Sequence, residues 1–228
     1  MSRLDAFRAV VFDLDGTLID SAPDVANAVN RTLAELGRPP LDFGAVKPMI
    51  GDGVRPLLEK ALSATGPAPA PDQVAAGIAR YLHFYRAEPA AHTVVYPGVR
   101  ETLRLLADRG LRLGVCSNKP HEMTVLVLEA LGLAGLFRAI LGGGVLPVQK
   151  PDPGHLGHVL ALMAVTAAET AFVGDSEVDM AAARNGGVRS IAVGYGYARA
   201  PASELDTDIL IQSFSQVPDA LARLGVLP

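Results

Sequence analysis

The stretch Ala9-Val10-Val11-Phe12-Asp13-Leu14-Asp15-Gly16-Thr17-Leu18 contains the strongest indication of the fold. Its first four residues form a short apolar run, which is typical of a strand buried on both faces in a parallel sheet covered by helices. Two carboxylates, Asp13 and Asp15, follow this predicted strand directly. Ligands of open α/β sheets bind at the carboxyl ends of the strands, so both carboxylates stand where a binding site is expected.

Further apolar runs predict more buried strands, and helix-like segments alternate with them. The predicted strands span residues 111–116, 139–141, 171–173 and 190–193, and the predicted helices span residues 98–109, 122–131, 155–163 and 178–184. Strands that alternate with helices at this spacing indicate βαβ crossovers. The sequence therefore predicts an α/β fold with a doubly wound, Rossmann-like parallel sheet.

The segment that follows the first strand interrupts this alternation. It contains only helix-like patterns, at residues 25–36, 54–64 and 73–86, with a linker rich in Gly, Pro and Ala at residues 65–71. We interpret it as an all-helical insert. The predicted organisation is an α/β core of residues 1–19 and 91–228 with an inserted helical domain of residues 20–90, which suits a chain of 228 residues.

Composition and charge disfavour several classes of protein. The net charge is −4, and there is no Trp, so neither a broad basic face nor aromatic stacking predicts a nucleic-acid partner. The chain lacks an apolar run of membrane-spanning length, and residues 1–6 do not resemble a signal peptide. The single cysteine, Cys116, cannot form an internal disulfide and reads as a small buried hydrophobe. We therefore expect a cytoplasmic protein without a membrane partner, and the sequence favours no particular oligomeric state.

The pair Asp13 and Asp15 has two interpretations. Residues two apart along an extended chain point to the same side, and two neighbouring carboxylates repel each other unless a cation lies between them. A hard divalent ion with oxygen ligands, such as Mg²⁺, suits such a site. The alternative is an ordinary turn, in which Asp-Gly sequences are common.

A second acidic group follows another predicted strand, in Gly174-Asp175-Ser176-Glu177-Val178-Asp179. Asp175 stands at the strand end, and Asp179 is one helical turn further along. Metal binding by these acids is compatible with the simpler interpretation that Asp175 or Ser176 caps the next helix.

Polar groups also follow two other predicted strands, at residues 111–116 and 139–141. The hydroxyl of Ser117, the amide of Asn118 and nearby backbone N–H groups suit phosphate oxygens at a helix N-terminus, although simple helix capping explains them as well. Lys150 lies beside Pro151 and Pro153, which restrict the backbone and could direct its side chain inward; alone, a lysine is usually a solvated charge.

In this order, the motifs resemble those of the haloacid dehalogenase superfamily. They are Asp13-x-Asp15-Gly16-Thr17, Ser117-Asn118, Lys150-Pro151 and Gly174-Asp175-Ser176-x-x-Asp179. The resemblance covers nearly the whole chain, including the helical insert, which corresponds to a cap. It implies a Mg²⁺-dependent hydrolase of small phosphate esters.

The resemblance also implies a role for each residue. Asp13 would be the nucleophile that forms an aspartyl phosphate, and Asp15 would protonate the leaving alcohol and then activate water. Mg²⁺ would be held by the Asp13 side chain, the Asp15 backbone carbonyl and Asp175, with Asp179 acting behind these ligands or through water. The transferring phosphoryl oxygens would be bound by Ser117, Asn118 and Lys150.

Asp15 and several further stretches of sequence narrow the range of expected substrates. Asp15 favours phosphate esters over haloacids, because a leaving halide needs no proton. Three stretches resemble bacterial phosphoglycolate phosphatases: Met49-Ile50-Gly51-Asp52-Gly53-Val54-Arg55-Pro56-Leu57-Leu58, Ser117-Asn118-Lys119-Pro120 and Gly194-Tyr195-Gly196-Tyr197-Ala198. We therefore expect 2-phosphoglycolate as substrate. The alternatives are a phosphatase for another small metabolite, such as a sugar phosphate, and a non-catalytic binding module with this fold.

The insert supplies the candidates for substrate specificity. Gly51 and Gly53 would let the backbone approach a ligand closely. Lys47 and Arg55 could pair with a substrate carboxylate. The alternative for both cations is an exposed helix face.

Overall fold

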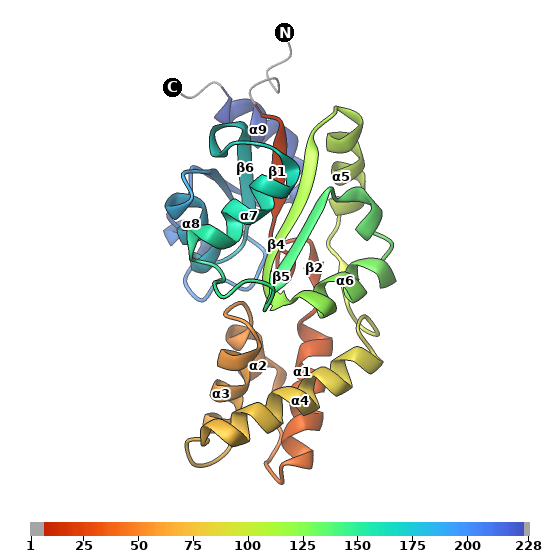
Figure 1. The fold of residues 1–228 in the computed structure, drawn as a ribbon, viewed down its shortest axis with the longest axis vertical. Helices are drawn as coiled ribbons and strands as arrows, with labels where there is room; N and C mark the ends of the chain where they lie inside the picture. Colours follow the sequence, from red (N-terminus) through yellow and green to blue (C-terminus); the bar gives the residue numbers. More distant parts are fainter. Residues whose placement is uncertain (1–6, 226–228) are drawn as a thin grey trace.

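The structure is a computed structural model, and it describes residues 7–225. Residues 1–6, where the sequence predicts no signal peptide, lie outside the described range. Strand β1 (Ala9–Phe12) is central in a six-stranded sheet of order β5-β4-β1-β6-β7-β8, and every pairing in this sheet is parallel (Figure 1). The other strands are β4 (Arg112–Pro120), β5 (Ala139–Gly143), β6 (Thr170–Gly174), β7 (Arg189–Val193) and β8 (Ile209–Ile211). The predicted parallel α/β sheet is confirmed, and β8 adds an edge strand that the sequence analysis did not predict.

Alternate residues of β1 lie in two different hydrophobic cores. Val10 and Phe12 belong to the core on one face, and Ala9 and Val11 belong to the core on the other, as the two-residue period of a strand requires. Helices α5 (Val99–Asp108), α6 (His121–Ala130) and α9 (Val217–Leu224) contribute to the first core, and α7 (Pro153–Met163) and α8 (Glu177–Asn185) to the second. Burial on both faces explains why the strands read as continuous apolar runs.

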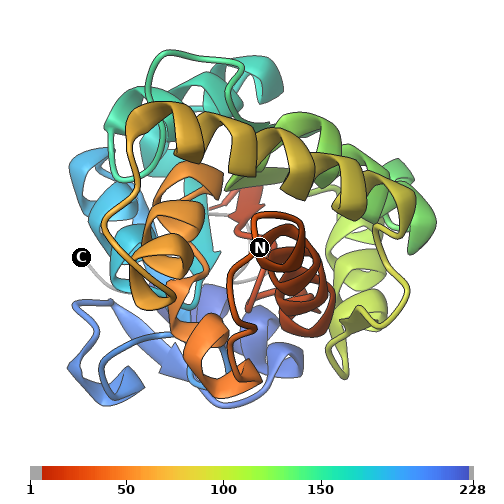
Figure 2. The ribbon, with the colours of Figure 1, turned by 90° about the horizontal axis from the view of Figure 1, so that it is seen from below.

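Four α-helices lie between β2 (Ile19–Asp20) and β3 (Val94–Val95) in sequence, and they form a separate layer beyond the carboxyl edge of the sheet (Figure 1). They are α1 (Ala22–Glu35), α2 (Phe43–Val46), α3 (Val54–Ala64) and α4 (Pro71–Ala87). Seen from below, these helices extend across the end of the sheet (Figure 2). We refer to this layer as the cap. None of the described helices has the length and apolar character needed to cross a membrane.

Two short strands connect the cap to the sheet domain. They are β2 (Ile19–Asp20) and β3 (Val94–Val95), which pair antiparallel where the chain leaves and returns. Beside them, the buried carboxylate of Asp24 accepts hydrogen bonds from the backbone N–H of His92 (3.0 Å) and from the backbone N–H (2.8 Å) and hydroxyl (2.6 Å) of Thr93. Asp24 therefore ties the start of α1 to the segment that leaves the cap.

Candidate active site

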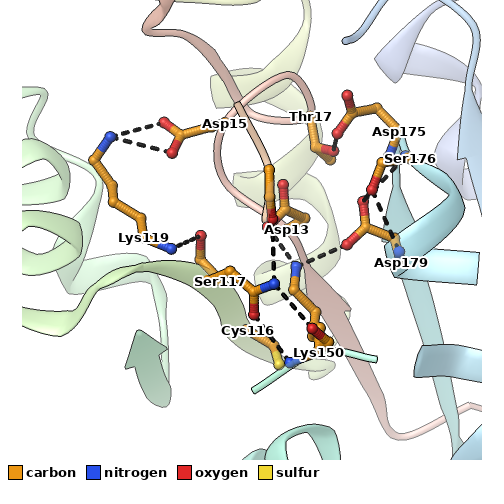
Figure 3. A network of polar contacts seen from close by, with 12 residues as sticks. Asp13, Asp15, Thr17, Cys116, Ser117, Lys119, Lys150, Asp175, Ser176 and Asp179 are labelled. Carbon is orange, nitrogen blue, oxygen red and sulfur yellow. Dashed lines mark hydrogen bonds and ion pairs between the residues drawn. The ribbon is translucent and has the colours of Figure 1, made fainter. Parts of the chain in front are cut away.

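The polar residues that follow four strands meet at one edge of the sheet, beneath the cap (Figure 3). Asp13 follows β1, Ser117 lies near the end of β4, Lys150 lies in the loop after β5, and Asp175 follows β6. They converge because the strands are parallel and neighbouring, so their carboxyl ends lie side by side.

Lys150 bridges two of the acids. Its Nζ lies 2.6 Å from Asp13 Oδ1 and 2.7 Å from Asp179 Oδ1, and only 2 % of its side chain is exposed. Burial alone would lower the pKa of Lys150, but the Asp13 and Asp179 carboxylates outweigh it and hold this pKa above its ordinary value. The ammonium group is therefore a permanent positive charge at the floor of the site.

Asp175 and Asp179 are fixed by hydrogen bonds from the surrounding loops. Asp175 accepts from the Thr17 hydroxyl (2.9 Å) and from the backbone N–H of Tyr197 (2.6 Å). Asp179 accepts from the Ser176 hydroxyl (2.7 Å) and from the backbone N–H groups of Asp175 (3.2 Å) and Ser176 (3.1 Å). Ser176 in turn caps α8, which confirms the capping interpretation of this motif and leaves the Asp175 and Asp179 carboxylates at the strand end.

Asp175 is packed between two glycines that leave no space for a side chain. Gly16 has φ +89°, and a Cβ there would lie 2.4 Å from Asp175 Oδ2. A Cβ on Gly196 would lie 2.3 Å from Asp175 Cβ. Both positions require glycine for close approach, and Gly16 also requires it for its backbone conformation.

The carboxylates of Asp13, Asp175 and Asp179 form a compact buried cluster. One oxygen of each lies within 4.8 Å of the others. Burial raises the pKa of Asp13 to about 7, although Lys150 opposes the rise, and burial with the neighbouring Asp179 raises the pKa of Asp175 well above its ordinary value. Three buried carboxylates beside one ammonium group leave an excess of negative charge, so this set of oxygen donors fits a hard divalent cation.

Asp15 has different partners from this cluster. Both of its carboxylate oxygens lie 3.1 Å from Lys119 Nζ (Figure 3). Its Oδ1 also accepts a hydrogen bond of 2.5 Å from the Ser21 hydroxyl. Lys119 comes directly after Asn118 in the motif that the sequence analysis quoted, but no role was assigned to its side chain. Ser21 lies at the start of the cap, so Asp15 is in contact with both layers of the molecule.

Ser117 and Asn118 also lie at the site, with different functions in the structure. The Ser117 hydroxyl accepts a hydrogen bond from the backbone N–H of Lys119 (3.3 Å). The Asn118 side chain accepts from the backbone N–H of Lys150 (2.9 Å) and donates to the carbonyls of Lys150 (3.0 Å) and Gly51 (3.2 Å). Its amide therefore holds the Lys150 backbone and the nearest loop of the cap.

The cap loop around Asp52 is fastened to the sheet domain. Asp52 Oδ2 lies 2.5 Å from both Arg199 Nη2 and Lys60 Nζ, and these cations lower the pKa of Asp52 although burial opposes them. The flanking glycines have φ +112° (Gly51) and +95° (Gly53), which L side chains rarely adopt. Nothing in the sequence indicated that the segment after β7, which carries Arg199, reaches the cap.

Two small cavities open between the cap and the strand ends, and both are lined by Asp13 and Asp15. Their volumes are about 40 and 20 Å³. The candidate cations Lys47 and Arg55 line neither of them: Lys47 Nζ lies 5.0 Å from the centre of the Tyr197 ring, and Arg55 is 57 % exposed and pairs with Glu59. A cavity of about 630 Å³ lies elsewhere, around the Arg184–Asp206 ion pair.

Cys116 lies under this site. It is fully buried, and burial raises the pKa of its thiol to about 12, with Lys150 opposing the rise. The thiol therefore stays protonated and packs as a small hydrophobe, as its place in an apolar strand predicts.

Comparison with known families identifies this arrangement. The model of the haloacid dehalogenase-like hydrolase family matches residues 10–193, which include the motifs around Asp13, Ser117, Lys150 and Asp175. The chain belongs to this family. The superfamily resemblance and the α/β core with a helical cap are therefore confirmed.

Relatives and solved structures of the family match nearly the whole chain. A phosphoglycolate phosphatase of Rhodospirillum rubrum is 41 % identical, over 97 % of this chain and 96 % of its own. One of Chromobacterium violaceum is 42 % identical, over 96 % and 98 %. The crystal structure of a predicted phosphoglycolate phosphatase from Haemophilus somnus superposes with a TM-score of 0.90 at 29 % identity, covering 96 % of this chain and 99 % of that one.

Proposed function

We propose that the protein is a Mg²⁺-dependent phosphatase whose substrate is 2-phosphoglycolate, which it hydrolyses to glycolate and phosphate. The observation that carries the substrate is the identity of about 40 % with phosphoglycolate phosphatases over nearly the full length of both chains. The geometry supports the chemistry, because a buried carboxylate, a lysine and an acidic cluster meet at the carboxyl edge of the sheet.

In the first half of the reaction, an Asp13 oxygen attacks phosphorus and the bond from phosphorus to the glycolate oxygen breaks. Asp15 gives its proton to that oxygen, so glycolate leaves as an alcohol. In the second half, Asp15 takes a proton from water, which attacks the aspartyl phosphate. Phosphate then leaves, and the Asp13 carboxylate is regenerated.

The surrounding residues stabilise the charge of the phosphoryl group. Lys150 neutralises part of it while holding Asp13, and Ser117 with the backbone around Asn118 binds the equatorial oxygens. Mg²⁺ would be held by Asp13, the Asp15 carbonyl and Asp175, and when bound it supplies the remaining positive charge. Asp179 orients Lys150 and completes the acidic cluster.

We further propose that the core of residues 1–19 and 91–228 supplies the chemistry and that the cap of residues 20–90 selects the substrate and excludes water. The cavities between the two layers have volumes of only about 20 and 40 Å³, so we expect the cap to move away when substrate enters. The free thiol of Cys116 suits a reducing compartment, which favours the cytoplasm.

A panel of small phosphate esters tests the proposal. We expect 2-phosphoglycolate to have the highest kcat/KM, EDTA to stop turnover, Mg²⁺ to restore it, and Asp13→Asn to abolish it. A sugar phosphate that ranks well above 2-phosphoglycolate would establish the alternative substrate. Absence of turnover on every ester in the presence of metal would favour a non-catalytic binding module.

A further inference from the structure

The larger of the two cavities has one apolar side and one polar side. The cap contributes apolar and aromatic side chains, and the sheet domain contributes carboxylates, a hydroxyl, an amide and one ammonium group. The side chains on the cap side are those of Val25, Ile50, Val54, Leu57 and Tyr81, and Gly51 and Gly53 contribute backbone. Among the described residues that line this cavity, Lys119 is the one with a positive charge.

Lys119 is held in place from two directions. Its Nζ lies 3.1 Å from both oxygens of Asp15, and it lies 4.5 Å from the centre of the Tyr85 ring, which stacks on Tyr81 at 5.6 Å. Only 5 % of the Lys119 side chain is exposed. An ammonium group has three N–H donors, so the pairing with Asp15 leaves capacity for a second acceptor.

We propose that Lys119 binds the carboxylate of the substrate and thereby determines specificity for a small phosphorylated acid. This inference rests on the proposed function. When phosphorus lies against Asp13, the carboxylate of a two-carbon phosphate ester is only a few bonds away, within the cavity that Asp13 and Lys119 line together. A carboxylate enclosed by the cap requires a cationic partner, because burying it unpaired is costly.

The other cations at the site are already occupied. Lys150 is bound by Asp13 and Asp179, and Arg199 is bound by Asp52. Both line the smaller cavity and not the larger one. Lys119 also has a partner, but that partner is the acid that acts on the leaving alcohol, so substrate and Asp15 meet at the same ammonium group.

The apolar side of the cavity disfavours a sugar phosphate. Sugar hydroxyls that face Val25, Ile50, Val54 and Leu57 would find no side-chain hydrogen bonds, and among the cap residues that line the cavity the Tyr81 side chain and the backbone of Gly51 and Gly53 are left to supply them. A polar group left without a partner in such a site lowers affinity. A short acid with one methylene between its two charged ends avoids this cost.

The test compares two substrates in one variant. In 2-hydroxyethyl phosphate, a neutral hydroxymethyl group replaces the carboxylate of 2-phosphoglycolate. The quantity compared is the kcat/KM for 2-phosphoglycolate divided by the kcat/KM for 2-hydroxyethyl phosphate. We expect Lys119→Met to lower this ratio at least about 30-fold, because removing one member of a buried charge pair typically has an effect of this size. The ratio cancels any effect of Lys119 on Asp15, because both substrates use the same acid.

Three further variants serve as controls. Lys119→Arg keeps the positive charge and should preserve most of the ratio. Arg55→Met should leave the ratio unchanged, as should Arg104→Met, which removes an exposed cation on α5. An equal fall for both substrates in Lys119→Met, or a lost preference in Arg55→Met, would overturn the inference and leave the proposed function intact. A wild-type enzyme that prefers 2-hydroxyethyl phosphate would refute both.

A crystal structure provides a second test that needs no change at Lys119. The inactive variant Asp13→Asn, crystallised with 2-phosphoglycolate and Mg²⁺, should show a carboxylate oxygen within about 3 Å of Lys119 Nζ. A carboxylate bound by Arg55 or Lys47 instead would contradict the proposal.

Discussion

When divalent cations are removed with EDTA, the protein should lose stability as the pH rises from about 4 to about 7. Burial raises the pKa of Asp13 from 3.8 to about 7. Within this window the folded protein still binds a proton that the unfolded chain has released. The free energy of unfolding therefore falls as the pH rises. Well below pH 3.8 Asp13 is protonated in both states and does not make the free energy of unfolding depend on pH.

The expected magnitude follows from the size of the shift. A rise of about three pKa units corresponds to about 4 kcal/mol, at 1.36 kcal/mol per unit. For a chain of this size, that loss lowers Tm by roughly 8–16 °C. Burial and the neighbouring Asp179 also raise the pKa of Asp175, which acts in the same direction.

The assay is thermal unfolding followed by circular dichroism between pH 4 and 8, in EDTA and in Mg²⁺. Asp13→Asn is the matched control, because an amide does not titrate and its curve should be flatter over this window. Mg²⁺ should stabilise the wild type strongly at pH 8 and weakly at pH 5, where protons compete for the same oxygens. Equal slopes for the wild type and Asp13→Asn in EDTA would refute the reasoning.

Three other substitutions test separate contacts. Lys150→Met should abolish turnover and lower the free energy of unfolding by about 3–5 kcal/mol, because it leaves buried carboxylates unpaired; a urea-unfolding curve like that of the wild type would contradict this. Arg199→Met should lower the free energy of unfolding by less than about 1 kcal/mol, because its pair with Asp52 is partly exposed. Hydrogen exchange at the Asp52 amide should nevertheless become faster, and unchanged exchange would show that other contacts hold the loop. Gly16→Ala should cost at least about 1–2 kcal/mol and weaken Mg²⁺ binding in calorimetry, because its Cβ would collide with Asp175; undiminished affinity would contradict the close packing.

The core of the fold was predictable because its strands are long enough and buried on both faces. The apolar runs at residues 9–12 and 171–173 lie in β1 and β6, and the predicted helix at residues 54–64 has the bounds of α3. The short antiparallel pair β2–β3 and the edge strand β8 were not predictable. Strands β2 and β3 have two residues each, which is too short to show any periodicity, and they form because the two connections to the cap lie side by side.

The convergence of the acids was predictable, but their partners were not. Parallel strands bring their carboxyl ends to one edge, so acids that directly follow strands must meet there. Lys119, which holds Asp15, is 104 residues from it in the sequence. Tyr197, whose hydroxyl donates to Asp20 (2.6 Å), is 177 residues from Asp20. The local sequence around Lys119 and around Tyr197 gives no sign of these contacts. Only the three-dimensional arrangement of the loops assigns these pairs.

Asp13 and Asp15 are two residues apart, and the fold gives them separate environments. Asp13 belongs to an acidic cluster with Lys150, where positive charge must offset burial for the carboxylate to act as a nucleophile. Asp15 is held by Lys119 and by Ser21 at the start of the cap. Two acids in different surroundings can take different roles in one reaction. Ser21 belongs to the start of the cap and Lys119 to the sheet domain, so Asp15 is positioned by both layers, whereas Asp13 is positioned within the sheet domain, by β1 and by its pair with Lys150.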